Sequence, residues 1–351
     1  MRQLAMEMNK MHFDIHALFF RPNAEREKEL QDHGVKTVMV PVSSYKSIDP
    51  LRAMLEVKRY LQRHDIQLVH AFDAPTCTLV VPAARLARTR VVLGSQRGNR
   101  LWDPKVSQWL RWLTDRLAHG IVVNGKDFID QLERAGVPRS KMHFCPNGLD
   151  TDRFVADGRK RFPEVEDATV VLGCTAVHRP EKMMPFLVDA FAEIRRQRPG
   201  VKLVLAGNGP ETPKVLARIE ANQLGSDCVV IPHTPNTAWI LRAIDLFLLT
   251  SATEGTPNSL MEAMACGTPV LASNVEGTRD LVEDGVNGFL FEYMNQADMV
   301  KKAVALIDHA ALRQKIAAYS TPWIRETLGL NASARRMAAI YDQYLGKNGV
   351  H

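Results

Sequence analysis

The sequence predicts an α/β protein with two doubly wound, Rossmann-like domains that face each other across a cleft. Short β-branched or apolar runs alternate with helical patterns along the 351 residues, in two successive series. Strands that are apolar on both faces and separated by amphipathic helices are typical of parallel sheets covered on both sides. A chain of this length also exceeds what one hydrophobic core usually supports. Two parallel sheets, each with its own helices, are therefore expected.

The first series of expected strands lies in the N-terminal half and consists of FDIHALFF, VKTVMVPV, IQLVHAF, RVVLGS, GIVVNG and MHFCPNG. Between the second and third runs, PLRAMLEVKRYLQRHD has apolar residues at i, i+3, i+4 and i+7, which is the spacing of an amphipathic helix. Charge, glycine and proline then replace the periodic pattern in RFVADGRKRFPEVEDATV, as in a linker. We therefore expect an N-terminal domain over residues 1–160.

The second series consists of TVVLGCTAV, KLVLAGNG, CVVIPH, LFLLTS, PVLAS and GFLFEY. The helical pattern MPFLVDAFAEIRRQRP follows the first of these runs. Together they predict a C-terminal domain over residues 161–325. Ligands of such sheets bind outside the carboxyl ends of the strands, so a site is expected in the loops that follow these runs.

Composition excludes several classes of protein. No apolar run approaches the roughly 20 residues that a membrane-spanning helix needs, and MRQLAMEMNK lacks the apolar core of a signal peptide. The five cysteines are scattered without a CxxC pair or a histidine cluster, which argues against a structural zinc site and a disulfide framework. A cytoplasmic protein with reduced cysteines in its cores is the expectation.

Positive charge is concentrated in the first half of the chain. The formal net charge is +6, and residues 1–150 hold 23 Lys+Arg against 16 Asp+Glu. Within this half, NRLWDPKVSQWLRWLTDRL interleaves tryptophans with arginines on an expected amphipathic helix. This composition suits the surface of an anionic membrane, although a helix that packs its tryptophans on its own sheet, with arginines in solvent, has the same pattern. Nucleic acid is not an expected partner, because no recognition motif accompanies the charge.

The stretch EGTPNSLMEAMACGTPV is the strongest candidate for a site. It follows the strand LFLLTS with a polar turn and then a helix, for which we expect Asn258 or Ser259 as N-cap and Glu262 in a capping box. Glu254 is expected in the loop. The N–H groups of a helix start suit a phosphate group, and two neighbouring carboxylates suit hydroxyl groups. A nucleotide sugar offers both, whereas a capping box beside a surface glutamate explains the spacing without a ligand.

The longer run SATEGTPNSLMEAMACGTPVLASNVEGTRDLVEDGVNGFLF closely resembles the signature of the retaining glycosyltransferases of family 4, with its E-G-x-P turn, E-A-M-A helix and G-x-P-V strand. Other stretches agree with that family in order and spacing: RPEK at 179–182, LAGNGP at 205–210 and NGLDTDRF at 147–154. The resemblance covers nearly the whole chain. It implies the two-domain GT-B fold, with a final helix over residues 326–351 that crosses back to the first domain.

The resemblance also implies a donor site in the C-terminal domain. Arg179 and Lys182 resemble the cations that hold the departing pyrophosphate, where fixed positive charge stabilises the transition state. Glu262 resembles the carboxylate that binds the ribose hydroxyls, and Glu254 resembles the carboxylate beside the transferred sugar. Catalysis without an essential metal or other cofactor is implied as well. The remaining donor contacts that the resemblance implies are Gly207, Gly209, Gly255, Thr256, Asn258, Ser259 and Leu260.

The chain departs from this family at its start. Relatives open with a strand and a glycine-rich loop before the first helix, whereas MRQLAMEMNK already resembles that helix. The first strand of such a domain is normally central in its sheet. The expectation is therefore a missing first strand with a gap flanked by apolar strands, from a truncated or misassigned start or from a domain with a rearranged core.

A second departure lies near the expected reaction centre of the N-terminal domain. Many relatives carry a histidine after the strand that ends near Leu93, but this chain has the sequence GSQRGN there. Arg97 is a candidate to bind an anionic acceptor or the donor phosphate, and it cannot be a general base because it stays protonated. His70 is the remaining candidate for a catalytic histidine, although backbone hydrogen bonds explain a histidine at a strand end equally well. Arg97 and Asn147 are assigned to the acceptor side.

The resemblance implies a retaining hexosyltransferase that uses a nucleoside-diphosphate sugar, with a UDP-sugar before a GDP-sugar because UDP donors are the commoner ones in that family. The expected acceptor is a glycan or lipid-linked molecule in the synthesis of cell-envelope polysaccharide or lipopolysaccharide. The protein is expected in the cytoplasm, in peripheral contact with the inner face of the cytoplasmic membrane. The alternatives are a catalytically impaired nucleotide-sugar-binding protein and an epimerase of the same fold. A nicotinamide-dependent oxidoreductase is disfavoured because GNGPET lacks the third glycine of a dinucleotide-binding loop.

Overall fold

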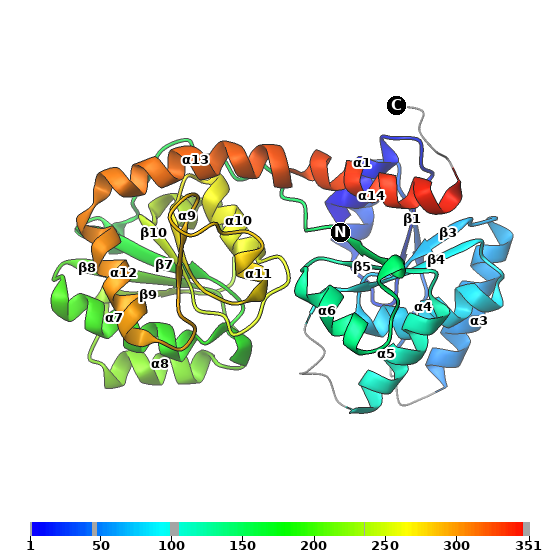
Figure 1. Ribbon diagram of the computed structural model, residues 1–351, viewed down its shortest axis with the longest axis horizontal. Coiled ribbons are helices and arrows are strands. Elements are labelled where there is room, and N and C mark those ends of the chain that lie inside the picture. Colours follow the sequence, from blue (N-terminus) through cyan, green and yellow to red (C-terminus); the bar gives the residue numbers. More distant parts are fainter. Residues whose placement is uncertain (1, 44–47, 99–104, 235, 347–351) are drawn as a thin grey trace. The chain divides into compact units, whose positions relative to one another are not determined.

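The computed structural model describes residues 2–43, 48–98, 105–234 and 236–346 (Figure 1). The chain divides into two compact units, unit 1 with residues 1–148 and 330–351, and unit 2 with residues 149–329. The division lies before the expected boundary at residue 160, because Leu149, Phe154 and Val165 are buried in the core of unit 2. All strand pairs in both units are parallel, as predicted for doubly wound α/β domains.

Unit 1 has its strands in two separate sheets. One sheet pairs β1 (His16–Phe19) with β2 (Lys36–Met39), and the second contains, in this order, β3 (Leu68–His70), β4 (Val91–Gln96), β5 (Gly120–Val123) and β6 (Met142–Phe144). The helices of this unit are α1 (Arg2–Asn9), α2 (Ala24–Asp32), α3 (Asp49–Arg63), α4 (Ala74–Leu86), α5 (Lys105–Leu117), α6 (Asp127–Arg134) and α14 (Leu330–Leu345).

A cavity of about 960 Å³ lies between the two sheets of unit 1. All residues of β1 and β3 line it, and within the described parts of the chain these strands pair on one edge each, with β2 and β4 respectively. Leu4 of α1, Leu61 of α3 and Tyr341 of α14 complete the lining. The expected gap, flanked by apolar strands, is therefore confirmed.

The C-terminal helix α14 belongs to unit 1, although the chain reaches it from unit 2. It shares one buried cluster with α1, β4 and β5, to which it contributes Met337 and Tyr341. The helix therefore takes part in the core of unit 1 and covers one side of the second sheet.

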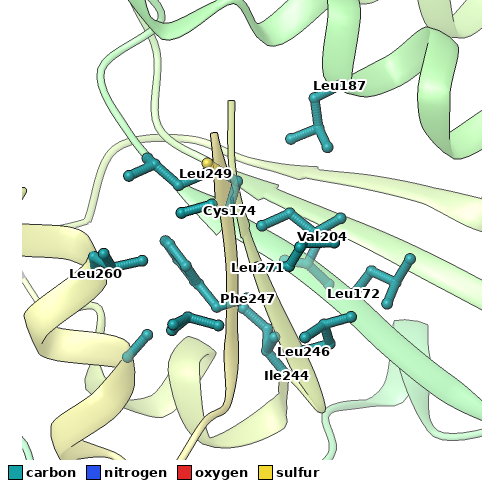
Figure 2. Packing of buried hydrophobic residues seen from close by; sticks show 14 of the residues in the cluster. Leu172, Cys174, Leu187, Val204, Ile244, Leu246, Phe247, Leu249, Leu260 and Leu271 are labelled. Carbon is teal, nitrogen blue, oxygen red and sulfur yellow. The ribbon is translucent and has the colours of Figure 1, made fainter. Parts of the chain in front are cut away.

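Unit 2 contains one parallel sheet in the order β12-β11-β10-β7-β8-β9. Its central strands are buried along their whole length, as unbroken apolar runs predict. Figure 2 shows Leu172, Phe247 and Leu271 from three strands close to Leu187 and Leu260 from two helices. The strands are β7 (Val170–Thr175), β8 (Val201–Ala206), β9 (Cys228–Ile231), β10 (Leu246–Leu249), β11 (Val270–Ser273) and β12 (Phe289–Phe291).

The helices of unit 2 alternate with these strands, and the last two of them follow the final strand. They are α7 (Met184–Gln197), α8 (Thr212–Ala221), α9 (Ala238–Ala243), α10 (Asn258–Ala265), α11 (Glu276–Arg279), α12 (Gln296–Asp308) and α13 (Ala310–Leu328). Every run that was predicted to be a strand, in either unit, contains one.

The tryptophan-rich helix α5 does not pack as one of the two interpretations predicts. Trp109 and Trp112 are 59% and 39% exposed, whereas Arg111 is only 6% exposed. Packing of these tryptophans on the unit's own sheet, with solvated arginines outside, is therefore wrong. The helix has apolar residues on more than one face, so its pattern does not fix which face turns inward. Trp102, which belongs to the same run, lies outside the described residues.

The five cysteines are all buried and free of disulfides, as predicted. Burial raises the pKa of the Cys77 thiol to about 11 and that of the Cys174 thiol to about 12. Thiols with such pKa values stay protonated at neutral pH and are poor nucleophiles. Across the helices that the structure describes, none combines the length and the apolar character that crossing a bilayer requires.

Candidate active site

The carboxyl edge of the unit 2 sheet contains the switch point of its topology. β8 and β9 follow β7 on one side of it, and β10, β11 and β12 follow on the other. Open α/β sheets bind ligands outside the carboxyl ends of the strands, at the place where the strand order reverses. The loops after β7 and β10 therefore frame the candidate site. These loops are the ones that contain RPEK and SATEGTPN.

Lys182 and Glu254 meet at this switch point. Lys182 ends the short helix Pro180–Lys182 after β7, and its Nζ lies 2.5 Å from Oε1 of Glu254 in the loop after β10. Ser251 Oγ donates a hydrogen bond to the same carboxylate oxygen at 2.6 Å. The two charged side chains are 21% and 10% exposed, so bulk water screens the pair only in part. Two predicted residues from distant parts of the sequence are thus in direct contact.

Arg179, the second predicted cation, lies on the same loop and is more exposed. Its Nη1 is 3.8 Å from Oε1 of Glu181, and 61% of its side chain is exposed. A surface contact of this kind stabilises its geometry by little, so the guanidinium is free to reorient toward a ligand. The loop itself is held in place, since Ala252 N–H donates to the carbonyl of Glu181 at 2.7 Å and Thr250 Oγ1 donates to that of Lys182 at 2.9 Å.

The two predicted glycines after β8 allow their loop to approach the loop after β7. A Cβ atom on Gly207 would clash with the carbonyl oxygen of Ala176, and one on Gly209 would clash with that of His178. Gly207 also has a φ of +139°, which favours glycine. Both residues therefore pack their backbone against the loop after β7, which frames the candidate site.

Helix α10 begins at Asn258, and Pro257 occupies its N-cap position without a side-chain hydrogen bond. The predicted capping box is therefore wrong. The carbonyl of Pro257 accepts hydrogen bonds from the N–H groups of Leu260 and Met261, and the proline side chain has no acceptor atom that could cap the helix. Glu262 Oε2 instead accepts a hydrogen bond from Thr237 Oγ1 at 3.3 Å.

The half-buried Glu262 carboxyl can accept hydrogen bonds from hydroxyl groups, which its predicted role requires. Burial raises its pKa above the ordinary value, although the hydrogen bond from Thr237 and the charge of Arg153 act in the opposite direction. A carboxylate out of bulk water gains from any hydroxyl that donates to it. The other predicted donor contacts lie in the turn before α10 and in its first turn: Gly255, Thr256, Asn258, Ser259 and Leu260. Leu260 points its side chain into the core (Figure 2), and its N–H donates to the carbonyl of Pro257.

The predicted catalytic histidine, His70, lies inside unit 1. Its Nε2 is 2.7 Å from Ser95 Oγ and its Nδ1 is 2.8 Å from the hydroxyl of Tyr341. Burial, with a smaller contribution from the charge of Arg97, lowers the pKa of His70 to about 3. An imidazole with both nitrogens occupied and so acidic a conjugate acid is a poor general base. These contacts favour a structural role for His70 over the predicted catalytic one.

Arg97 and Asn147, the two residues predicted for the acceptor side, contact each other at the carboxyl edge of unit 1. Arg97 follows β4 directly, and its Nη1 donates to Asn147 Oδ1, in the loop after β6, at 2.6 Å. Asn124, which follows β5, donates to the same oxygen at 3.4 Å. Three strand ends thus contribute to one polar cluster.

Several residues of these two regions were missed by sequence reasoning. Ser251 and Thr237 bond the two site glutamates, and Tyr341 bonds His70 from the opposite end of the chain. Gly277 of α11 meets the carbonyl oxygen of Gly255 so closely that a Cβ atom would clash. Only Gly277 has a local signal, a glycine in VEGTRD directly after a strand. The contacts of Thr237 and Tyr341 join segments that are far apart in sequence, whereas Ser251 lies three positions before Glu254 in the same loop.

No set of three or more His, Cys, Asp or Glu side chains in the described part of the chain could hold a metal ion. Metal-independent catalysis stays a prediction. The groups that could balance the charge of a diphosphate in unit 2 are the side chains of Arg179 and Lys182, together with the positive end of the α10 dipole.

Two family descriptions match consecutive parts of the chain. "Glycosyl transferases group 1" matches residues 159–323, and "Glycosyltransferase Family 4" matches residues 1–153. The first match contains all of the donor-site residues named above, and the second contains His70, Arg97 and Asn147.

Curated relatives support the same family. The GDP-mannose-dependent α-(1-6)-phosphatidylinositol monomannoside mannosyltransferase of Mycobacterium tuberculosis is 31% identical over 287 residues, which are 72% of this chain and 70% of the relative. An Escherichia coli UDP-Gal:α-D-GlcNAc-diphosphoundecaprenol α-1,3-galactosyltransferase is 22% identical over 298 residues, 80% of this chain and 77% of the relative.

Among solved structures, HepE from Anabaena in complex with UDP and glucose superposes with a TM-score of 0.84 at 19% identity. The match covers 97% of this chain and 95% of that chain. At this identity the similarity supports the fold alone, and it agrees with the two doubly wound units described above.

Proposed function

Because this chain belongs to family 4 of the glycosyltransferases and has the GT-B fold, we propose that it is a retaining enzyme that moves a hexosyl unit from a nucleoside-diphosphate sugar. The proposed acceptor is a glycan or lipid-linked molecule in cell-envelope polysaccharide synthesis, since two relatives act by name on phosphatidylinositol monomannoside and on a diphosphoundecaprenol-linked sugar. The observation that carries the proposal is the contact of Lys182 with Glu254 at the switch point of the unit 2 sheet.

The proposed chemistry follows from the charges at that switch point. As the bond from the anomeric carbon to the diphosphate breaks, negative charge grows on the leaving oxygen. Lys182 and Arg179 stabilise this charge, which is larger in the transition state than in the bound donor. In the proposed front-face reaction the leaving phosphate takes the proton of the acceptor hydroxyl. No protein base is required, which agrees with the buried setting of His70.

Glu254 is proposed to bind the transferred sugar and not to act as a nucleophile. Its carboxylate already accepts hydrogen bonds from Lys182 and Ser251, and donor hydroxyls would replace part of these contacts. Glu262 is proposed to bind the ribose hydroxyls. A covalent glycosyl adduct trapped on Glu254 would contradict the first assignment.

A thermal-shift titration with nucleoside diphosphates and their sugars tests this function. A ligand that binds the folded state raises its apparent stability by RT ln(1 + [L]/Kd). We expect a rise with a UDP-sugar, and a GDP-sugar is the second candidate because the name of the 31% identical relative specifies GDP-mannose. Incubation of the same donor with acceptor should release the nucleoside diphosphate. Binding without release would favour the impaired binding protein, and interconversion of the donor sugar would favour the epimerase.

A peripheral contact with anionic membrane is proposed for the exposed face of α5. Trp109, Trp112 and Arg116 are spaced i, i+3 and i+7 and therefore share one helix face. The Arg116 guanidinium lies 4.6 Å from the centroid of the Trp112 ring. Tryptophans and arginines on one surface suit the interface between acyl chains and anionic headgroups.

Replacement of Trp109 and Trp112 by serine is expected to lower binding to vesicles that contain anionic lipid by roughly tenfold or more, because two exposed aromatic anchors are lost. Flotation with vesicles of phosphatidylcholine and phosphatidylglycerol measures this binding. Substitution of Trp239, which is 37% exposed on unit 2, is the matched control. Unchanged flotation of the double variant would remove α5 as the contact.

A further inference from the structure

The positively charged side chain of Arg97 lies at the carboxyl edge of the second sheet in unit 1. Its side chain is partly buried, and its Nη1 donates to Asn147 Oδ1. The guanidinium carbon lies 5.4 Å from the centroid of the Phe72 ring. The Nε atom is buried and has no hydrogen-bond acceptor. One amide oxygen and one aromatic face are thus the contacts of a group that offers five N–H donors.

No carboxylate among the described residues forms an ion pair with Arg97. The titratable groups that act on it are the thiol of Cys145, the phenol of Tyr341 and the imidazole of His70. Burial keeps the first two protonated by raising their pKa values, and it keeps His70 neutral by lowering its pKa to about 3. Among the described residues, the titratable groups that act on this guanidinium are therefore uncharged at neutral pH, while the guanidinium itself stays charged.

A partly buried cation without a counter-charge is costly for the folded state. Two other partly buried cations are paired, Arg161 with Asp245 at 2.6 Å and Lys182 with Glu254 at 2.5 Å. The partly buried Lys141, Arg313 and Arg325 donate to backbone carbonyls instead. Among the described residues, Arg97 has neither a carboxylate nor a backbone carbonyl as a partner. Its position next to the end of β4 is where a parallel sheet binds ligands.

The charge of unit 1 as a whole points in the same direction. Residues 1–148 and 330–351 contain 26 Lys+Arg and 16 Asp+Glu, a net charge of +10, whereas unit 2 has 19 and 23, a net charge of −4. A field of this sign raises the local concentration of anionic ligands. The net charge of unit 1 and the guanidinium of Arg97 both indicate that unit 1 binds an anionic ligand.

We propose that Arg97 is a specificity residue that binds an anionic group, a phosphate or a carboxylate, of the acceptor. This inference rests on the proposed transferase function, in which unit 1 binds the acceptor. The guanidinium provides a planar fork that matches either group, and Asn147 holds that fork in place. Arg97 is a binding residue here and takes no part in breaking the bond to the donor.

Inorganic phosphate, titrated in the presence of a saturating nucleoside diphosphate, is the first probe, because the diphosphate occupies the donor site of unit 2. Phosphate should raise the Tm of the wild type. In Arg97→Gln the apparent Kd for phosphate should rise at least about tenfold, since a charge-assisted hydrogen bond is lost, and Arg97→Lys should fall between the two. Arg63→Gln removes the same charge from an exposed position of unit 1 and should respond as the wild type does.

Two further measurements separate the alternatives. Affinity for the nucleoside diphosphate should be the same in Arg97→Gln and in the wild type, and a loss of that affinity would make Arg97 a donor ligand instead. The Tm of Arg97→Gln without ligands should be no lower than that of the wild type, whereas a drop of several degrees would indicate a structural arginine. An unchanged phosphate response in Arg97→Gln would also overturn the proposal. If the protein transfers no sugar at all, the phosphate titration without nucleotide still tests Arg97.

Discussion

Lys182→Ala is expected to lower kcat/KM for glycosyl transfer by roughly 10²- to 10³-fold, the usual cost of removing one fixed group that stabilises developing negative charge. The effect should fall mainly on kcat, because the charge on the leaving diphosphate is larger in the transition state than in the ground state. Steady-state release of the nucleoside diphosphate, measured over a range of donor concentrations, separates kcat from KM.

Two companion variants control for effects on folding. Lys182→Ala leaves the Glu254 carboxylate with the hydroxyl of Ser251 as its remaining side-chain partner, so some loss of stability is expected. Combining it with Glu254→Gln removes the unpaired charge and should recover stability without recovering activity. Lys214→Ala removes an exposed lysine that pairs with Glu211 in the same unit and should be active. Transfer at the wild-type rate by Lys182→Ala would overturn the assignment.

Glu262→Gln is expected to weaken donor binding by roughly tenfold to a hundredfold, because a hydrogen bond to a charged group contributes more than one between neutral groups. The contact with Thr237 can be kept by the amide, so the fold should survive. Calorimetric titration with the nucleoside diphosphate measures the loss. Thr237→Val is a useful comparison, since it removes the protein's own hydrogen bond to Glu262 and leaves the carboxylate in place.

The wild type and Glu262→Gln should differ in how their stability depends on pH. Burial raises the pKa of Glu262 in the folded state above its ordinary value, so the charged form is less favourable in the folded than in the unfolded chain. The wild type therefore loses stability as pH rises through the folded pKa of this group, and Glu262→Gln does not. The variant should match or exceed the wild-type Tm at neutral pH, with the difference closing below the ordinary pKa of a glutamate. A lower Tm at neutral pH would contradict the assigned pKa direction.

Much of the fold could be predicted because its strands are buried on both faces. β7, β10 and β11 are buried at every position, so their sequences are unbroken apolar runs between turn residues. The gap in unit 1 could also be predicted, since it follows from the order of elements in the family. The rotation of α5 could not, because Trp109, Trp112 and Leu110 leave no single apolar face and tertiary packing decides which side turns inward.

The candidate site was predictable where residues lie in one loop and much less so where contacts span the sequence. Glu254 and Lys182 were named individually, but their contact joins segments separated by 72 positions. The capping box failed because the N-cap residue is Pro257, whose side chain cannot accept a hydrogen bond, and because the partner of Glu262 is Thr237, 25 positions away. The partner of His70 could not be predicted for a related reason, since the hydroxyl of Tyr341 comes from the last helix. Side-chain partners at such separations leave no local pattern.

We propose that Arg179 and Lys182, in the loop after β7, bind the diphosphate of the donor. Calorimetric titration of the wild type and of the double variant Arg179→Ala/Lys182→Ala, each with a nucleoside diphosphate and with the matching monophosphate, tests it most directly. The wild type should prefer the diphosphate, and the double variant should lose most of that preference while binding the monophosphate with nearly unchanged affinity. An undiminished preference for the diphosphate in the double variant would contradict the claim.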